Sequence, residues 1–390
     1  MQHLATRLQH HPYQPPPGFC AIEPGVYHAS TVLFPSVAAM RARDWRSKNG
    51  YTYGLHGTPT TFALEERLAS LDGGKYCILC PSGLSAITLI DQALLGQGDH
   101  VLLPANAYGP GREFVERVLA RWGVSHSLYP ALASAEQLAA LFTPSTRLLW
   151  LEAPGSVTME MPDLRALVAV AKARGVYTAI DATWAAGIAL QPFELGIDMV
   201  MQALTKYQSG GADMLMGSVT TRDPALHEQL LFTHMRLGLG VCGDDCAKVL
   251  RGLHSLELRY AAHDAAARRI ATWLQTQPQV AQVLHPALPG SPGHEHWLRD
   301  CTAAAGLFSV VFHDRYTPAQ IDAFVDALRL FRIGYSWGGP VSLAVPYDVQ
   351  AMRPAGQWTH KGGLVRLAIG LEDVQDLIAD LQQAMQSALV

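Results

Sequence analysis

The chain has 390 residues, of which 49% are hydrophobic and 16% are charged, and its formal net charge is −4 at pH 7. This apolar composition excludes a disordered chain, and the length predicts two or three domains. The slight negative charge excludes a general nucleic-acid binder, and no polybasic segment is present that would hold the chain to a membrane.

Residues 1–57 are predicted to be an irregular N-terminal arm, in which Pro, Gly, Tyr and His are scattered. Such a segment rarely builds a core of its own, so we expect it to wrap a neighbouring subunit. The arm lacks the apolar centre of a secretory signal, and no apolar run in the chain is long enough to span a bilayer. We therefore expect a cytoplasmic protein without a membrane contact.

From about Thr61 the chain alternates between helical patterns and short apolar runs. Helices are predicted at 62–71, 84–95, 112–122 and 163–174, and strands at 77–80, 101–104, 148–152, 176–181 and 199–203. These strands are apolar throughout rather than alternating. That pattern indicates a parallel sheet covered by helices on both faces.

The last third of the chain is predicted to form a smaller α/β domain. A long helical segment at 248–275 begins it, strands follow at 307–312 and 364–369, and an amphipathic helix at 371–385 ends it. We place the cofactor domain at 58–252 and the C-terminal domain at 253–390.

Six cysteines are too few for a disulfide scaffold in a chain of this length. Cys77 and Cys80 lie in an apolar strand, where side chains alternate between faces, so the two thiols should point in opposite directions. Cys242 and Cys246 have helical spacing but no second ligand pair, and the segment 294–296 (His-Glu-His) lacks a third ligand. We interpret the cysteines as structural and 294–296 as a solvated or structural segment, and we expect no metal site.

Three features carry chemistry. Gly83 follows a predicted strand and opens a helix, which places backbone N–H groups where a phosphate could bind, although a plain strand-to-helix turn has the same pattern. Asp181 ends a buried strand, the position at which open α/β sheets bind ligands, although a helix-capping acid would also fit. Lys206 follows the next apolar strand, where partial burial would make its amine nucleophilic, unless it is an ordinary surface lysine.

Together the three features suggest pyridoxal phosphate. The lysine would form the Schiff base, the acid would pair with the pyridinium nitrogen, and the helix N-terminus would take the phosphate. The ring would then act as an electron sink.

The chain also resembles the Cys/Met-metabolism family of pyridoxal-phosphate enzymes, from about residue 25 to the end and in the order of the family's motifs. The stretches that carry the resemblance are 51–54 (Tyr-Thr-Tyr-Gly), 71–74 (Leu-Asp-Gly-Gly), 107–108 (Ala-Tyr), 151–156 (Leu-Glu-Ala-Pro-Gly-Ser), 181–187 (Asp-Ala-Thr-Trp-Ala-Ala-Gly), 205–207 (Thr-Lys-Tyr), 285–290 (His-Pro-Ala-Leu-Pro-Gly), 335–339 (Tyr-Ser-Trp-Gly-Gly) and 366–373 (Arg-Leu-Ala-Ile-Gly-Leu-Glu-Asp). The resemblance implies the type I, aspartate-aminotransferase-like α/β fold, with a mostly parallel sheet and a smaller C-terminal α/β domain. It also implies a homotetramer built from two dimers.

The resemblance further implies the residue roles. Lys206 is the Schiff-base lysine and moves the Cα proton, Asp181 holds the pyridine nitrogen, and Tyr108 stacks on the ring and assists proton transfer. The phosphate is bound by Gly83, Leu84, Thr205 and, from a neighbouring subunit, Tyr53. The carboxylate of an amino-acid substrate is bound by Arg366, beside Ser336 and Trp337.

Some positions depart from the family pattern. Leu55 replaces an arginine that usually clasps the phosphate, and His56 beside it would substitute only weakly and in a pH-dependent way. Ala182 and Ala203 replace an asparagine and a hydroxyl residue. The loss of one charged phosphate contact would cost about 1.5–3 kcal/mol of cofactor binding.

We expect carbon–sulfur β-elimination, in which L-cystathionine yields homocysteine, pyruvate and ammonia. The Ser-Trp-Gly-Gly form at 336–339 resembles the β-acting members of the family more than the γ-acting ones. A cysteine desulfhydrase or a γ-acting lyase or synthase stays open as an alternative. A degenerate protein that binds the cofactor without catalysis is the alternative of another class.

Overall fold

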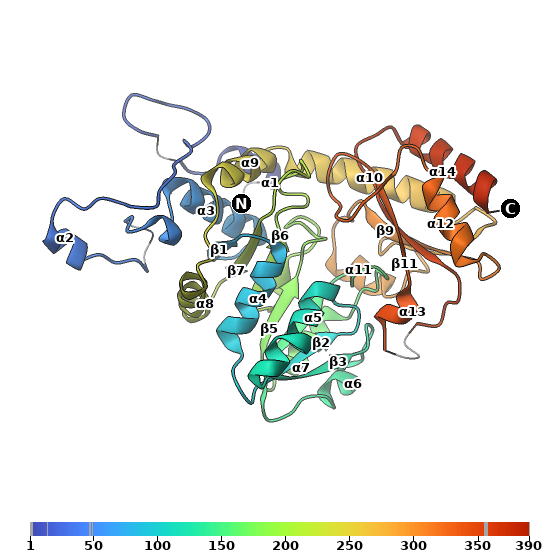
Figure 1. Ribbon diagram of the computed structural model, residues 1–390, viewed down its shortest axis with the longest axis horizontal. Coiled ribbons are helices and arrows are strands. Elements are labelled where there is room, and N and C mark those ends of the chain that lie inside the picture. The colour runs from blue at the N-terminus through green and yellow to red at the C-terminus, as the bar shows by residue number, and fades with distance from the viewer. Residues whose placement is uncertain (1–2, 14, 47, 49, 355–357, 390) are drawn as a thin grey trace.

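The computed structural model describes residues 3–13, 15–46, 48, 50–354 and 358–389. Within them the chain forms two sheets, and the long helix α10 (Leu256–Leu274) leads from the first to the second (Figure 1). None of the helices in these ranges combines the length and the apolar character needed to cross a membrane.

The first sheet is mostly parallel, as predicted. Its strands lie in the order β1-β7-β6-β5-β4-β2-β3, and β2 to β6 run parallel to one another. Strand β7 is antiparallel to both of its neighbours, and its polar sequence, Gly-Ser-Val-Thr-Thr, explains why an apolar pattern missed it. The strands are β1 (Tyr76–Cys80), β2 (His100–Pro104), β3 (Ser125–Tyr129), β4 (Thr146–Glu152), β5 (Tyr177–Asp181), β6 (Met199–Ala203) and β7 (Gly217–Thr221).

Helices cover both faces of this sheet. One apolar core lies under α4 (Gly83–Leu94), α5 (Gly109–Arg117) and α8 (Pro224–Leu237). The core on the other face includes side chains of α3 (Pro59–Asp72), α7 (Leu164–Lys172) and α9 (Gly243–Leu253). Cys77 belongs to one core and Cys80 to the other, which confirms that the two thiols point to opposite faces. Short segments complete the region: α6 (Ala135–Ala139) and η3 (Pro192–Leu195).

Two predicted helices are interrupted. The helix expected at 112–122 begins earlier and ends at Arg117, and a 3₁₀ turn, η2 (Leu119–Trp122), follows it. The segment expected at 248–275 consists of α9 and α10, separated at residues 254–255. The carbonyl oxygen of Gly252 accepts a hydrogen bond from the Arg259 guanidinium at 2.8 Å and from the Ser255 amide at 3.3 Å. These contacts depend on the fold, so the periodic pattern does not reveal the break.

The second sheet has the order β10-β11-β12-β9-β8 and is mainly antiparallel. The predicted strands at 307–312 and 364–369 are its neighbours β9 and β12. One face packs on α10, α12 and α14. Its elements are β8 (Val280–Leu284), α11 (His294–Asp300), β9 (Leu307–Phe312), α12 (Pro318–Asp326), β10 (Arg332–Ile333), β11 (Leu343–Tyr347), α13 (Val349–Met352), β12 (Leu364–Ala368) and α14 (Val374–Ala388).

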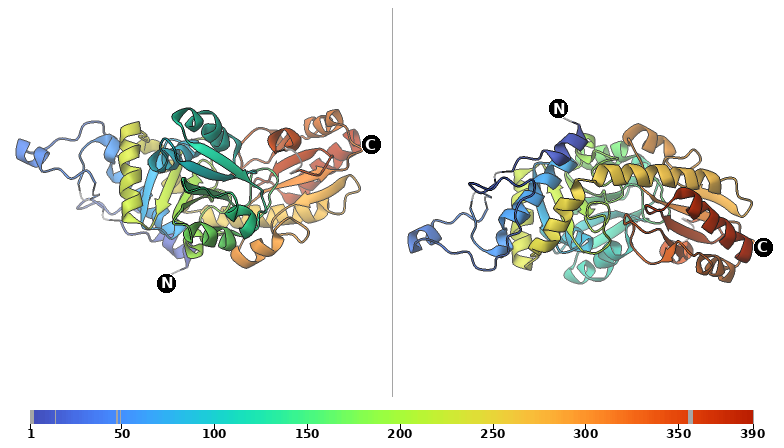
Figure 2. Two further views of the ribbon diagram at one scale, coloured as in Figure 1. Left: turned by 90° about the horizontal axis from the view of Figure 1, so that it is seen from below. Right: turned by 90° about the horizontal axis from the view of Figure 1, so that it is seen from above.

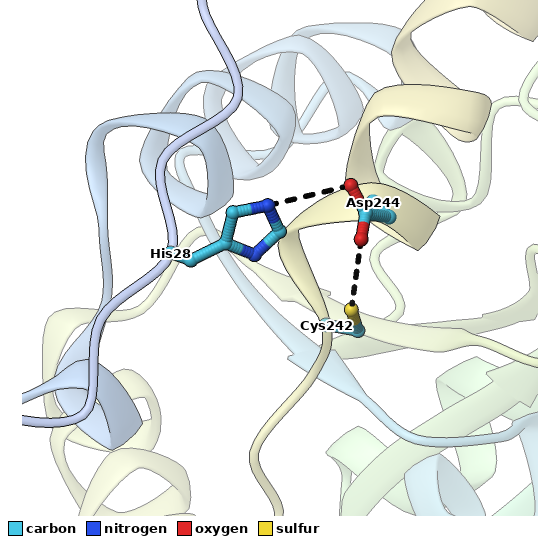
Figure 3. A group of neighbouring side chains, drawn as sticks. All are labelled: His28, Cys242 and Asp244. Carbon is cyan, nitrogen blue, oxygen red and sulfur yellow. Dashed lines mark hydrogen bonds and ion pairs between the residues drawn. The ribbon is translucent and has the colours of Figure 1, made fainter.

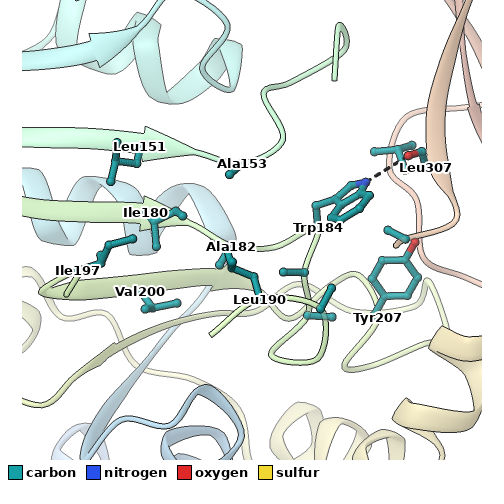
Figure 4. Packing of buried hydrophobic residues seen from close by; sticks show 14 of the residues in the cluster. Leu151, Ala153, Ile180, Ala182, Trp184, Leu190, Ile197, Val200, Tyr207 and Leu307 are labelled. Atoms are coloured by element: carbon teal, nitrogen blue, oxygen red, sulfur yellow. Dashed lines mark hydrogen bonds between the residues drawn. The ribbon is translucent and has the colours of Figure 1, made fainter. Parts of the chain in front are cut away.

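Two hydrogen bonds join the region of the first sheet to the start of β9, and Figure 4 shows the one between Trp184 and Leu307. The Trp184 indole donates to the carbonyl oxygen of Leu307 at 3.1 Å, and the Gly306 amide donates to the Tyr207 hydroxyl at 2.8 Å. Trp184 and Tyr207 are both buried. The second of these contacts anchors Tyr207, the residue that follows Lys206.

The N-terminal arm contains α1 (Leu4–Gln9), α2 (Val37–Arg41) and the 3₁₀ turn η1 (Gly54–His56). Helix α1 lies on α3, where the Arg7 guanidinium donates to the Ser70 carbonyl oxygen at 3.1 Å. The segment around α2 reaches away from both sheets (Figures 1 and 2). It leaves large apolar side chains exposed, among them Leu33, Val37 and Met40.

Candidate active site

Parallel strands bring the predicted acid and the predicted lysine to the same edge of the first sheet. Asp181 ends β5 and pairs in register with Glu152, the last residue of β4, and with Met201 on β6. Lys206 follows the end of β6. Carboxyl ends of parallel strands are the usual ligand edge of such sheets.

Asp181 is held by its own turn. One carboxylate oxygen, Oδ1, accepts hydrogen bonds from the Thr183 amide at 3.0 Å and from the Thr183 hydroxyl at 2.6 Å. The same hydroxyl accepts a hydrogen bond from the Ala203 amide on β6 at 2.9 Å. Burial raises the pKa of Asp181, whereas the Thr183 hydrogen bonds and the nearby Lys206 amine lower it. Among the described residues none donates to Oδ2, so that oxygen is available to a donor outside the chain.

The Lys206 amine lies between Ser336 and Trp337. Its Nζ donates to the Ser336 hydroxyl at 2.7 Å and lies 5.2 Å from the centre of the Trp337 ring. Burial, and then the Arg366 cation, lower the pKa of Lys206 to about 8, although Asp181 opposes this. The amine therefore loses its proton more readily than a free lysine does, as a nucleophile requires.

The segment that carries Ser336 and Trp337 has an unusual backbone. Ser336 has φ +89° and Gly338 has φ +77°, both in the left-handed region. A Cβ atom at Gly338 would lie 3.1 Å from the Tyr207 amide nitrogen, so the segment packs directly on the backbone next to Lys206. A left-handed conformation is costly for a serine, and strained backbone of this kind is common at ligand sites.

Arg366 is a half-buried cation whose guanidinium has a donor that no described residue uses. It stands on β12 with its Cζ 5.2 Å from the centre of the Tyr347 ring, and its Nη2 donates to the Ser336 carbonyl oxygen at 3.4 Å. Its Nε is buried without a hydrogen-bond partner in the described chain. A guanidinium with a free edge suits a carboxylate ligand, which it binds through two parallel hydrogen bonds.

Tyr108 caps the N-terminus of α5, and Glu152 holds it there. The Tyr108 amide donates to Glu152 Oε2 at 2.7 Å, and the Ser156 hydroxyl donates to Oε1 at 2.6 Å. Burial and then the Asp181 charge raise the pKa of Glu152. Tyr108 is 43% exposed and borders a pocket that Glu152 and Asp181 also line.

The N-terminus of α4 forms the predicted anion cradle. The Ser82 hydroxyl caps the Ser85 amide at 3.0 Å, and the amides of Gly83 and Leu84 precede the first hydrogen bonds of the helix. A Cβ atom at Gly83 would lie 2.6 Å from Ala203 Cβ, so glycine is required where the helix meets β6. The Thr205 hydroxyl accepts a hydrogen bond from the Met216 amide at 3.2 Å.

Tyr53 does not contact the predicted cofactor site of its own chain. It precedes η1, its hydroxyl accepts a hydrogen bond from Ser30 at 3.3 Å, and its side chain is 45% exposed. None of the described contacts joins Tyr53 to Lys206, Asp181 or Gly83.

Comparisons with known proteins agree with this geometry. The model of the family described as "Cys/Met metabolism PLP-dependent enzyme" matches residues 5–386. The chain belongs to this family. A cystathionine β-lyase of Bordetella avium is 40% identical, over 99% of this chain and 98% of that protein. The cystathionine β-lyase MetC of Escherichia coli is 39% identical, over 93% of this chain and 92% of the relative.

The crystal structure of MetB from Corynebacterium glutamicum has the same fold as this chain. It superimposes with a TM-score of 0.89 at 30% identity and covers 99% of this chain and 98% of the other. The predicted type I fold is therefore confirmed.

The residues of this family member fit pyridoxal phosphate, the cofactor of the family. Asp181 would offer a carboxylate oxygen to the pyridinium nitrogen, and Lys206 would offer an amine of lowered pKa. The first amides of α4 would bind the phosphate, at a helix start where Gly83 packs closely on Ala203. Two of the departures from the family pattern lie in packed surroundings: Ala182 is buried in an apolar core, and Ala203 packs on Gly83.

Sequence reasoning assigned no role to Glu152 or Thr183, although both lie within the stretches that carry the family resemblance. A hydroxyl residue two positions after Asp181 is the pattern of a side-chain turn, so that signal was present. The contact between Glu152 and the Tyr108 amide joins distant segments, and no local pattern predicts it.

Proposed function

We propose that this enzyme is a cystathionine β-lyase, which cleaves the Cβ–S bond of L-cystathionine. One molecule of substrate and one of water yield homocysteine, pyruvate and ammonia. The observation that carries the proposal is the half-buried Lys206 amine, which contacts Ser336 and Trp337 and lies near Arg366 and Asp181. The names of the Bordetella and Escherichia relatives support the same reaction.

Arg366 binds the α-carboxylate of the substrate in this proposal. Its buried Nε is without a partner in the described chain, and the contact of its Nη2 with the Ser336 carbonyl is long, so a carboxylate can occupy the free edge. The carboxylate would then fix the substrate Cα near the Lys206 amine, which lies close enough to Arg366 for the cation to lower its pKa.

Lys206 removes the Cα proton. Pyridoxal phosphate, when bound, supplies the electron sink that makes this proton acidic. Lys206, which is an ammonium after it takes the Cα proton, or the Tyr108 hydroxyl then donates a proton to the sulfur as the sulfur leaves Cβ. The three-carbon product hydrolyses to pyruvate and ammonia, so protons and atoms balance.

We further propose that the active enzyme is a cytoplasmic homotetramer and that Tyr53 of each chain reaches the phosphate site of a neighbour. The exposed Tyr53 ring and the exposed apolar residues of the arm support this assembly, because a monomer would leave them in water. The division into an arm at 1–57, a cofactor domain at 58–252 and a C-terminal domain at 253–390 is part of the same proposal.

The experiment is product identification after incubation of the cofactor-saturated enzyme with L-cystathionine. Pyruvate with homocysteine is the expected result. 2-Oxobutyrate with cysteine would contradict the proposal and make the enzyme γ-acting, which would also remove the role assigned to Trp337. If only L-cysteine yields pyruvate, the enzyme is a cysteine desulfhydrase.

The Lys206→Ala variant is the control for this experiment. It should lose the Schiff-base absorbance and turnover, by about a thousandfold or more, because both depend on the amine. Near wild-type rates in this variant would refute the proposed role of Lys206. If the wild-type protein binds no cofactor and yields no keto acid, the non-catalytic alternative replaces the proposal.

A further inference from the structure

Outside the active site, the N-terminal arm and the start of α9 bring three different metal-ligating side chains together (Figure 3). They are His28, Cys242 and Asp244, and their ligand atoms all lie within 4.8 Å of one another. His28 Nε2 is 3.4 Å from Asp244 Oδ1, and Cys242 Sγ is 3.9 Å from Asp244 Oδ2. Cys242 is exposed, whereas Cys246 is buried.

The backbone holds His28 next to α9. The buried Thr60 hydroxyl on α3 accepts from the Tyr27 amide at 2.8 Å and donates to the Gly25 carbonyl oxygen at 3.0 Å. A Cβ atom at Gly243 would lie 2.9 Å from the Tyr27 carbonyl oxygen and 3.5 Å from His28 Nδ1. The arm therefore lies directly on the first residue of α9, between the two residues that provide sulfur and oxygen.

The nearby lysine, Lys248, pairs with other carboxylates and not with Asp244. Asp245 forms an ion pair with Lys248 at 3.3 Å, and the same lysine is 3.7 Å from Asp213. Asp244, by contrast, faces only His28 and Cys242 among the contacts of the described chain. All three side chains are exposed, so water can complete the coordination.

The chemistry of the three ligands selects the ion. Imidazole nitrogen, thiolate sulfur and carboxylate oxygen together suit Zn²⁺ and similar borderline-soft divalent cations better than Mg²⁺ or Ca²⁺, which prefer oxygen alone. Bond lengths of about 2.0–2.3 Å around a tetrahedral ion imply ligand–ligand distances of about 3.3–3.8 Å. The contacts of His28 and Cys242 with the two Asp244 oxygens, at 3.4 Å and 3.9 Å, are close to that range.

We propose that His28, Cys242 and Asp244 form a binding site for a divalent transition metal of the Zn²⁺ class, with water as the fourth ligand. On binding, the Cys242 thiol releases its proton to solvent and bonds to the metal as thiolate. The metal fastens the arm to α9, and so restricts the segment that leads from His28 to Tyr53.

The test uses Co²⁺ as a spectroscopic substitute for Zn²⁺ on the metal-stripped, cofactor-loaded enzyme. A thiolate ligand gives charge-transfer absorption and tetrahedral cobalt gives bands at wavelengths longer than those of the cofactor. We expect one Co²⁺ per chain, displaced by Zn²⁺. Cys242→Ser should abolish the charge-transfer absorption, and His28→Gln and Asp244→Asn should each weaken binding by about tenfold or more.

Cys20→Ser is the matched control, because Cys20 is also an exposed cysteine of this chain. It should leave the cobalt spectrum and the stoichiometry unchanged. Circular dichroism and the cofactor spectrum check that each variant is folded. The proposal is overturned if wild-type enzyme shows no saturable cobalt band, or if Cys242→Ser retains the wild-type spectrum and stoichiometry.

Discussion

At the residue scale, Glu152 shows how a carboxylate can influence the active site without carrying the reaction. Its two oxygens accept hydrogen bonds from the Tyr108 amide and the Ser156 hydroxyl. Its register partner is Asp181, whose charge helps to raise the pKa of Glu152. Glu152 thus connects the position of the Tyr108 ring to the residue proposed to hold the cofactor nitrogen.

We predict that Glu152→Gln weakens this connection. An amide has one oxygen and one NH₂ group, so one of the two donors, Tyr108 N–H or Ser156 O–H, loses its acceptor. An ordinary hydrogen bond contributes about 0.5–1.5 kcal/mol, so kcat/KM for L-cystathionine should fall by about twofold to tenfold. Steady-state assays with saturating cofactor measure this change.

Two further variants separate positioning from a general loss of stability. Ser156→Ala removes only the second donor and should lower kcat/KM less than Glu152→Gln. In a Tyr108→Phe background, Glu152→Gln should add little, because both changes act through the same ring. Fully additive effects of the two changes would contradict a positioning role for Glu152.

At the element scale, the contact between α4 and β6 determines the shape of the anion cradle. The helix begins so close to the end of β6 that a Cβ atom at Gly83 would meet the Ala203 side chain at 2.6 Å. At the same end of β6, the Ala203 amide donates a hydrogen bond to the Thr183 hydroxyl. A displacement of α4 would therefore disturb both the phosphate end and the Asp181 turn of the site.

Gly83→Ala should reduce cofactor affinity by about tenfold or more, because the first turn of α4 must move away from β6. Titration of cofactor-free enzyme with pyridoxal phosphate measures the affinity. Ala203→Gly in the same chain should recover part of it by making room. Wild-type affinity in the single variant would show that the close approach is unimportant.

Gly109→Ala is a control for the effect of alanine itself. Gly109 is the first residue of α5 and a Cβ atom there meets nothing within 4 Å. Since alanine favours a helix over glycine by up to about 1 kcal/mol, this variant should be at least as stable as wild type in thermal unfolding.

At the scale of the whole molecule, the N-terminal arm carries Tyr53, the one predicted phosphate-binding residue that lies away from the site of its own chain. Helix α1 folds back on α3 of its own chain, but the segment around α2 reaches away from both sheets (Figure 2). Tyr53 lies at the end of that segment with its ring 45% exposed. This arrangement suits a residue that acts on a neighbouring chain.

Mixing two defective variants tests the shared site. Tyr53→Ala should weaken cofactor binding and Lys206→Ala should abolish turnover, but a hybrid dimer would contain one site with neither change. After co-refolding of equal amounts, we expect about a quarter of the sites to regain wild-type activity at limiting cofactor. Activity no greater than the sum of the separate variants would place Tyr53 in the site of its own chain, or outside any site.

The sequence by itself was sufficient for the parts of the molecule that depend on local pattern. Apolar runs located β2, β4, β5 and β6. Asp181 at the end of β5 and Lys206 just after β6 pointed to the cofactor chemistry. Such predictions succeed because a buried parallel strand must be apolar along its length, and its carboxyl end is the edge where ligands bind.

Only the tertiary structure decided the features that depend on contacts between distant segments. The break before α10 arises from the Arg259 contact with Gly252, and the polar strand β7 exists because β1 and β6 pair with it on both sides. The contact of Glu152 with Tyr108 and the proximity of His28 to Cys242 likewise join residues far apart in the chain. Local patterns record propensity and burial, whereas the pairing of distant groups is determined by how the whole chain packs.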